Sequence, residues 1–188
     1  VVIKPAELTP LTALAAAEQR EASEVVGVQD LTILDHPDGM LVYSLDLRRD
    51  IARRIREFRP DAVAVGSWDI EVGWGLNQAD HRVAGLSALD AVRDADNTWV
   101  HPELAEREGL PKWHVDRLLV YGHKEPTHGV PLSHDDVADA VASLSRHEAY
   151  FADLPDHPAP ADFIPDMLAR QGAPIGAAHD LLMRIFDL

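Results

Sequence analysis

Hydrophobic residues recur at two different spacings along this chain, and the alternation of the two predicts an α/β fold. Residues 46–58 and 80–95 carry apolar side chains at helical spacing, with charged residues between them. Residues 62–66 are a continuous apolar run, typical of a strand buried inside a parallel sheet, and residues 115–122 are expected to form another strand. Strands that alternate with helices in this order predict an α/β domain with a mainly parallel sheet.

Weaker patterns predict the remaining elements. The further helices are expected at residues 11–26, 135–154 and 161–171, and short strands at residues 1–4 and 30–34. Residues 67–79 and 97–113 are expected to be irregular, and the tail from Ala177 fits either a strand or a helix. The sequence contains neither an internal repeat nor a low-complexity linker, which favours one domain over residues 1–188.

The amino-acid composition argues against several classes of binding partner. The 188 residues carry a formal charge of −15, which argues against a nucleic-acid partner or an anionic membrane surface. No apolar run approaches the roughly 20 residues that span a bilayer, and no signal peptide is visible, so we expect a cytoplasmic protein. The absence of cysteine means that any zinc site must use histidine and carboxylate ligands.

Asp80 and His81 are the first candidate site, because they fall where a long loop enters a predicted helix. A carboxylate beside an imidazole raises its basicity and fixes its tautomer, as the partner of a metal-bound histidine does. The alternative is ordinary capping, in which Asp80 is the N-cap and His81 is an exposed residue without a role.

The loop before Asp80 carries Trp68, Asp69, Glu71 and Trp74 among glycines. Tryptophan faces stack on the C–H surfaces of sugars, and carboxylates accept hydrogen bonds from hydroxyl groups. This composition suits the rim of a sugar site. It suits equally well a loop that two tryptophans anchor in a small hydrophobic cluster.

The segment His36-Pro37-Asp38-Gly39 resembles half of a metal site but favours a turn. Proline presets φ at one position of a turn, glycine supplies a positive φ at the next, and Asp38 can bond the amides of its own turn. The loops after residues 30–34 and 62–66 should open on the same edge of the sheet, where sites gather in such folds.

Taken together, these segments resemble the LmbE-like/PIG-L deacetylases, especially their actinobacterial members. The resemblance rests on "HPDG", "IREFRPDAVAVG", "LNQADHRVAG" and "YGHKEPTHGVPLS" in this order, and it extends from about Glu18 onward. It implies a Rossmann-like three-layer domain and a Zn²⁺-dependent hydrolase that removes an acetyl group from an N-acetylated amino sugar or its conjugate. Members are often oligomeric, so a homo-oligomer is also implied.

The resemblance assigns roles to residues near the second helix. His81 would be a metal ligand and Asp80 its catalytic neighbour; Gln78 would replace a histidine that polarises the amide or acts as an acid. From residue type and position, and not from the resemblance, we also expect Asn77 or Gln78 to contact the oxyanion. On the same basis, we expect the substrate to be bound by Asp38, Trp68, Asp69, Trp74 and Asn77. The His-Pro-Asp-Asp motif that supplies the other ligands and the base is expected upstream of Val1.

Two departures from the family pattern affect the predicted chemistry. Ala15 stands where many relatives have an arginine, and Gln78 cannot supply a proton near neutral pH. A working enzyme would therefore need another group to protonate the leaving amine. The rival hypothesis is a deacetylase-like fold that serves as a sugar-binding or assembly module without a competent metal site.

Overall fold

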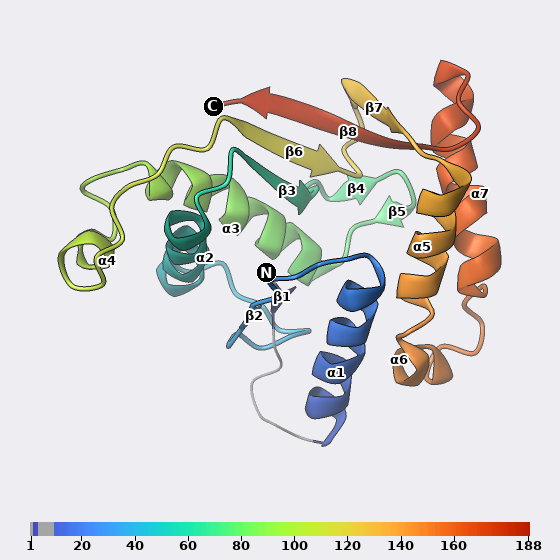
Figure 1. Cartoon of the computed structure of the whole chain (residues 1–188), viewed down its shortest axis with the longest axis horizontal. Coiled ribbons are helices and arrows are strands. Elements are labelled where there is room, and N and C mark those ends of the chain that lie inside the picture. The colour runs from blue at the N-terminus through green and yellow to red at the C-terminus, as the bar shows by residue number, and fades with distance from the viewer. Residues whose placement is uncertain (1, 4–9) are drawn as a thin grey trace. The chain divides into compact units, whose positions relative to one another are not determined.

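The computed structural model describes residues 2–3 and 10–188, and it contains the predicted alternation of strands and helices (Figure 1). The chain divides into two compact units. The first unit comprises residues 38–128 and 183–188, and the second comprises residues 2–37 and 129–182. The α/β fold class is confirmed, whereas one domain over residues 1–188 stays a prediction.

The first unit is built on a sheet. Its strands are β3 (Ala62–Gly66), β6 (Arg117–Tyr121), a hairpin of β4 (Glu71–Val72) and β5 (Gly75–Leu76), and the last residues of β8 (Asp180–Asp187). Its helices are α2 (Leu45–Phe58), α3 (Ala79–Ala95) and α4 (Pro102–Glu106).

Strand pairing in this unit is mixed. β3 runs parallel to β6 with Gly66 opposite Tyr121, and β8 runs antiparallel to β6 with Met183 opposite Tyr121. Helices α2 and α3 cover one face of the sheet (Figure 1). The hydrophobic core between these layers consists of Ala52, Ile55, Ala91, Val92, Ala95, Leu104, Val115, Leu118 and Val120.

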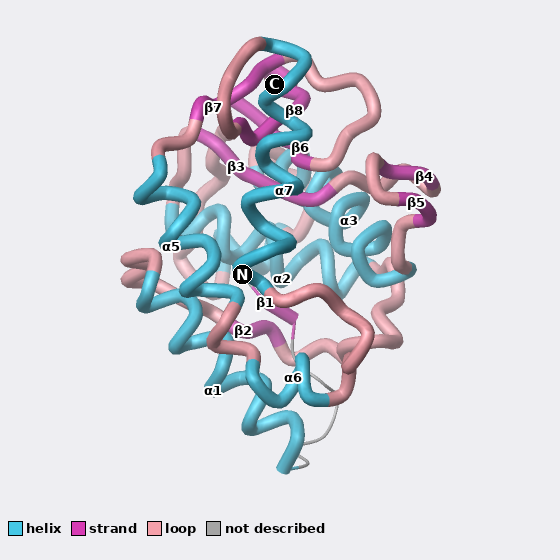
Figure 2. Tube along the Cα trace, turned by 90° about the vertical axis from the view of Figure 1, so that its right-hand side faces the viewer, coloured by secondary structure: helices cyan, strands magenta, loops and turns pink. Residues whose placement is uncertain are grey.

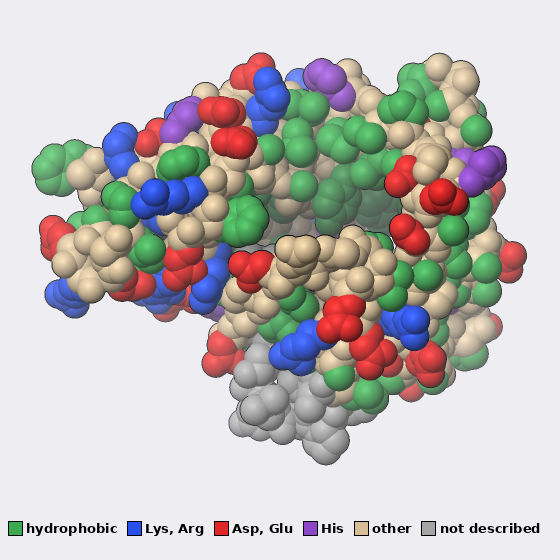
Figure 3. Space-filling model, in the orientation of Figure 1, with side chains coloured by type: hydrophobic (Ala, Val, Ile, Leu, Met, Phe, Trp, Pro, Cys, Tyr) green, Lys and Arg blue, Asp and Glu red, His purple; other side chains and the backbone are tan. Residues whose placement is uncertain are grey.

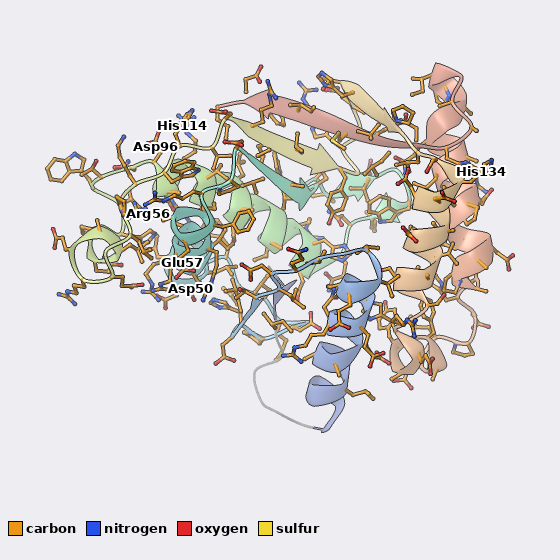
Figure 4. The ribbon with its side chains drawn as sticks, in the orientation of Figure 1. Asp50, Arg56, Glu57, Asp96, His114 and His134 are labelled. Atoms are coloured by element: carbon orange, nitrogen blue, oxygen red, sulfur yellow. The ribbon has the colours of Figure 1, made fainter. Side chains whose placement is uncertain are left out.

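Arg56 fixes the end of α2 against the end of α3. Its side chain is 1% exposed, and its guanidinium donates to the carbonyl oxygens of Asp94, Ala95 and Asn97 at 3.0–3.1 Å. Because the last carbonyls of a helix have no partner within the helix, a buried arginine here satisfies them and carries its charge toward the negative end of the dipole. Figure 4 shows Arg56 in this position.

The exposed side of α2 carries both signs of charge, as Figure 3 shows over α2 and α4. Arg53 bonds Asp50 and Glu108 at 2.7 Å each, and Arg54 bonds Glu57 at 2.6 Å. The charged residues that the helical pattern places toward solvent thus neutralise one another. Among the described residues, no helix is long and apolar enough to cross a membrane.

The second unit contains the remaining helices and short strands. Its helices are α1 (Pro10–Val25), α5 (His134–Leu144), α6 (Glu148–Ala152), α7 (Pro160–Gly172) and the 3-10 helix η1 (Ala173–Ile175). Its strands are β1 (Val2–Ile3), β2 (Ile33–Leu34), most of β7 (His128–Pro131) and the first residues of β8. Strands β1 and β2 pair in parallel.

Side chains connect α1 to the helices around it, and α5 lies between α1 and α7 (Figure 1). Buried Glu18 accepts a hydrogen bond from the Ala149 amide at 2.7 Å, which caps the start of α6. Ser143 donates to the carbonyl of Ala22 at 2.9 Å. The contact between Glu18 and Ala149 shows that this family-matched glutamate has a structural partner in the second unit.

Several predicted boundaries are corrected. The helix expected at residues 135–154 is interrupted, because residues 145–147 separate α5 from α6. The loop expected at residues 67–79 contains the β4–β5 hairpin, and the irregular stretch at residues 97–113 contains α4. The tail is a strand, β8, and the strand expected at residues 30–34 is formed only by Ile33 and Leu34.

Candidate active site

The candidate site lies at the carboxyl edge of β3 and β6. Because these strands are parallel and Gly66 is opposite Tyr121, the segments that follow them leave the sheet side by side. The Ser67 amide donates to the Tyr121 carbonyl at 3.0 Å and fixes this edge. The segment after β3 leads through the β4–β5 hairpin to α3, whose first turn lies beside it (Figure 2).

Gly85 allows α3 to lie close against this edge. A Cβ atom at Gly85 would come within 2.5 Å of the Gly66 carbonyl oxygen, nearer than any real Cβ contact. A glycine is therefore required for the helix to approach the backbone of β3. The close approach brings His81, one turn earlier on α3, to the end of the strand.

Asn77 determines how the His81 ring is held. Its side-chain nitrogen donates to the carbonyls of Ser67 at 2.7 Å and Asp69 at 3.1 Å, so its oxygen must be the atom that faces His81. That oxygen lies 3.3 Å from His81 Nδ1. An oxygen acceptor requires the proton on Nδ1, which leaves the lone pair of Nε2 available, as in a metal-binding histidine.

Gln78, and not Asp80, is the N-cap of α3. Its side-chain oxygen accepts hydrogen bonds from the amides of Asp80 at 2.6 Å and His81 at 3.2 Å. The expectation that Asp80 caps the helix is therefore wrong. Gln78 is exposed, and its side-chain nitrogen remains a donor toward solvent.

The Asp80 carboxylate instead holds the HPDG turn. It accepts hydrogen bonds from the amides of Gly39 at 2.6 Å and Leu41 at 3.2 Å. Gly39 has a φ of 80°, which confirms the turn that the sequence predicts, and Asp80 rather than Asp38 accepts from its amide. The two loops expected on one edge are thus joined through Asp80, and Asp38 is exposed beside them.

The remaining predicted substrate residues have different surroundings. Trp68 is partly buried against the core, and its ring lies 6.4 Å from that of Phe186. Trp74 is 61% exposed and lies over the backbone of Gly122. Trp68 therefore fits the anchoring alternative, whereas most of the Trp74 side chain is open to solvent.

Zinc takes histidine and carboxylate ligands, and His81 is the residue here that the resemblance assigns to the metal. The tautomer of His81 fits that role, but no three His, Asp or Glu side chains of residues 2–3 and 10–188 form a group that could hold a metal. These residues do not make a complete zinc centre by themselves. The Zn²⁺ expectation stays a prediction, and no reaction step is derived through a metal.

Sequence reasoning did not single out His123. This residue follows β6, and its Nε2 lies 3.9 Å from Asp69 Oδ2. The signal available in the sequence was its place after the run at residues 115–122, on the same edge as the loop after residues 62–66.

Comparison with known proteins agrees with this geometry. Residues 4–92 match the model of the PIG-L family, described as GlcNAc-PI de-N-acetylase. The match covers just under half of this chain, and it supports the resemblance to the PIG-L/LmbE-like family. The resemblance found in the sequence is confirmed, and the matched range includes the HPDG turn, Asn77, Asp80 and His81.

One curated protein that is similar to this chain is a deacetylase. The chain is 27% identical over 148 residues to a diacetylchitobiose deacetylase of Thermococcus kodakarensis, covering 71% of this chain and 48% of that protein. It therefore spans about half the length of this curated relative.

Solved structures support the fold. The N,N′-diacetylchitobiose deacetylase of Pyrococcus horikoshii, solved with an inhibitor, matches with a TM-score of 0.80 and 20% identity over 94% of this chain and 64% of its own. The 4-carboxy-2-hydroxymuconate hydratase GalB of Pseudomonas putida matches with a TM-score of 0.69 and 12% identity over 97% of this chain and 75% of its own. At such identities these matches show the fold alone, and the fold is shared by enzymes with different reactions.

Proposed function

We propose that this chain forms part of an N-deacetylase that hydrolyses the acetamido group of an amino sugar or its conjugate. The observation that carries the proposal is the contact between Asn77 Oδ1 and His81 Nδ1, which leaves His81 Nε2 free to bind a metal. Support comes from the family match over residues 4–92 and from relatives described as diacetylchitobiose deacetylases.

Zinc is the metal that we propose for the full-length protein, with His81 as one ligand. A bound zinc ion would lower the pKa of a water molecule and polarise an acyl oxygen. Asn77 orients the imidazole, and Asp80 holds the HPDG turn beside the first turn of α3. Trp74 and Asp69 are the side chains that we propose for contact with the sugar.

The rival function is sugar binding without catalysis. It is favoured by the lack of a group of three metal ligands among the described residues. The two functions predict different results when the full-length protein is supplied with zinc and an acetylated sugar. A deacetylase produces a free amine, whereas a binding module does not.

The test is the appearance of primary amine from N,N′-diacetylchitobiose and N-acetylglucosamine, followed with an amine-reactive dye. We expect amine from at least one of these sugars, and we expect the His81→Ala variant to produce none. The His114→Ala variant removes a histidine that lies before β6, at the opposite end of this strand, and should retain activity. Sugar binding without amine release would favour the rival.

A further inference from the structure

Two loops at the carboxyl edge of the first unit bring a carboxylate and an imidazole together. Asp69 follows β3, His123 follows β6, and Asp69 Oδ2 lies 3.9 Å from His123 Nε2. The His123 side chain is 11% exposed and that of Asp69 is 25% exposed. No local pattern links these residues, because they lie on separate loops.

The tautomer of His123 follows from its other nitrogen. The Glu125 amide donates to His123 Nδ1 at 3.0 Å, so Nδ1 carries the lone pair and the neutral ring carries its proton on Nε2. The N–H group of His123 therefore faces the Asp69 carboxylate. At 3.9 Å the contact is an ion-pair distance and longer than a hydrogen bond.

The two oxygens of Asp69 have different environments. Oδ2 is buried and has no hydrogen-bond partner among the described residues. The 25% of the Asp69 side chain that is exposed therefore does not include Oδ2. Oδ1 is the carboxylate oxygen that a ligand can reach. A buried carboxylate oxygen is costly unless a donor approaches it, and the His123 N–H group is the donor that faces it.

The loop after β6 also supports the exposed tryptophan of the site. The Trp74 indole lies against the backbone of Gly122, the residue before His123, and is 61% exposed. The Asp69 carbonyl accepts from Asn77, whose oxygen faces His81. An aromatic face, a carboxylate oxygen and the predicted metal ligand thus lie in one connected set of contacts.

From these contacts we infer that His123 is a positioning residue for a sugar subsite formed by Asp69 and Trp74. The ligand class is a pyranose: its C–H face stacks on Trp74, and its hydroxyl groups donate to Asp69 Oδ1. When the sugar binds, the His123 N–H group closes on Asp69 Oδ2 and holds the carboxylate in its orientation. Contacts of this kind are often long without ligand and shorten in the complex. The inference rests on the proposed function for its substrate, but sugar binding tests it separately.

The test compares His123→Leu with His123→Gln in the full-length, zinc-loaded protein. Leucine removes the donor, whereas the glutamine amide can still donate to Asp69. For His123→Leu we expect the KM for N,N′-diacetylchitobiose to rise about tenfold, the effect of losing one charge-assisted hydrogen bond, with kcat within about twofold of wild type. The His123→Gln variant should recover most of the lost affinity.

The matched control is His114→Leu, which removes a histidine that lies 3.0 Å from Asp96 before β6 (Figure 4). This change should leave KM unaltered. If wild type releases no amine, the proposed function fails, and the Kd of the sugar measured by calorimetry then replaces KM in the same comparison. Equal KM and equal Kd in wild type and His123→Leu would overturn the inference.

A second experiment uses only the wild-type protein, so its result does not depend on whether a variant folds. Nitrogen NMR of wild-type protein should show His123 with its proton on Nε2, and its signal should shift when N,N′-diacetylchitobiose is added while that of His114 does not. A proton on Nδ1, or a His123 signal unaffected by saturating sugar, would overturn the inference.

Discussion

Asn77 Oδ1 faces His81 Nδ1 at 3.3 Å, and the same amide group is fixed by the carbonyls of Ser67 and Asp69. Asn77 is 4% exposed, so water cannot replace these contacts. Its N–H groups, which sequence reasoning assigned to substrate or oxyanion, are both used within the loop. The oxyanion role stays a prediction, and the described contacts support a role in orienting His81.

The first prediction concerns this relationship. Asn77→Asp replaces the donor group with an oxygen that faces two carbonyl oxygens, so the side chain must turn away and release His81. The zinc affinity of the full-length protein, measured by competition with a chelator, should fall about 10- to 100-fold, as for other partners of metal-bound histidines.

The control for this prediction is Asn97→Asp. Asn97 uses its oxygen to accept from the Trp99 amide at 2.9 Å, and an aspartate can do the same. Zinc affinity should therefore be unaltered in the control. An Asn77→Asp variant that binds zinc as tightly as wild type would contradict the positioning role.

The second prediction separates the two carboxylates at the HPDG turn. Asp80→Ala removes the acceptor for the amides of Gly39 and Leu41 and should lower the free energy of unfolding by about 1–3 kcal/mol. Asp38→Ala removes an exposed carboxylate from the same turn and should change it by less than about 0.5 kcal/mol. Urea denaturation gives both values. The reverse order would show that Asp38 stabilises the turn.

The third prediction concerns pH. Burial lowers the pKa of His101, an effect that Asp94 and Glu103 oppose and that Arg48 and Arg49 reinforce. The unfolded chain, with a histidine pKa of about 6.5, then binds more protons than the folded protein in mildly acidic solution. Stability therefore rises with pH through this range and is lost as pH falls below about 6.5.

Thermal unfolding of wild type between about pH 8 and pH 5 checks this sign, because the loss should begin near the histidine pKa of about 6.5. The variant His101→Asn keeps a residue that tolerates the positive φ of 51° at this position. It should show a weaker loss of stability on acidification. A wild-type loss equal to that of the variant would assign the pH dependence to other groups.

The fourth prediction concerns Asp180 in the second unit. Its side chain is fully buried, and neither carboxylate oxygen has a hydrogen-bond partner among the described residues. Asparagine avoids the cost that a buried carboxyl group meets either in losing its hydration or in taking up a proton, so Asp180→Asn should raise the free energy of unfolding by about 1–3 kcal/mol. Asp187→Asn, an exposed change on the same strand, should have little effect. A lower stability for Asp180→Asn would mean that the carboxylate has a cationic or water partner.

The strongly periodic parts of the fold could be predicted from the sequence. Helices α2 and α3 were placed within one residue of their observed starts, and β3 was placed without error, because apolar spacing decides such segments. The β4–β5 hairpin was missed because each strand has two residues, too few for an alternating pattern. The break between α5 and α6 could not be predicted, because residues 145–147 include no proline or glycine.

The candidate site shows a similar limit. Aspartate is a better N-cap than glutamine, so local preference favoured Asp80. The structure reverses this choice because the Asp80 carboxylate is drawn to the amides of Gly39 and Leu41, far away in the sequence. His123 was not predicted for the same reason: its partner Asp69 lies on another loop, far away in the sequence.

We claim that His81 belongs to the metal site of an N-deacetylase. Acetate release from N,N′-diacetylchitobiose tests this, with bound zinc determined on the same samples of full-length wild type and His81→Ala. We predict acetate from zinc-containing wild type, and the loss of both zinc and acetate release in the variant. Undiminished acetate release by a His81→Ala protein, or none from wild type that holds zinc, would contradict the claim.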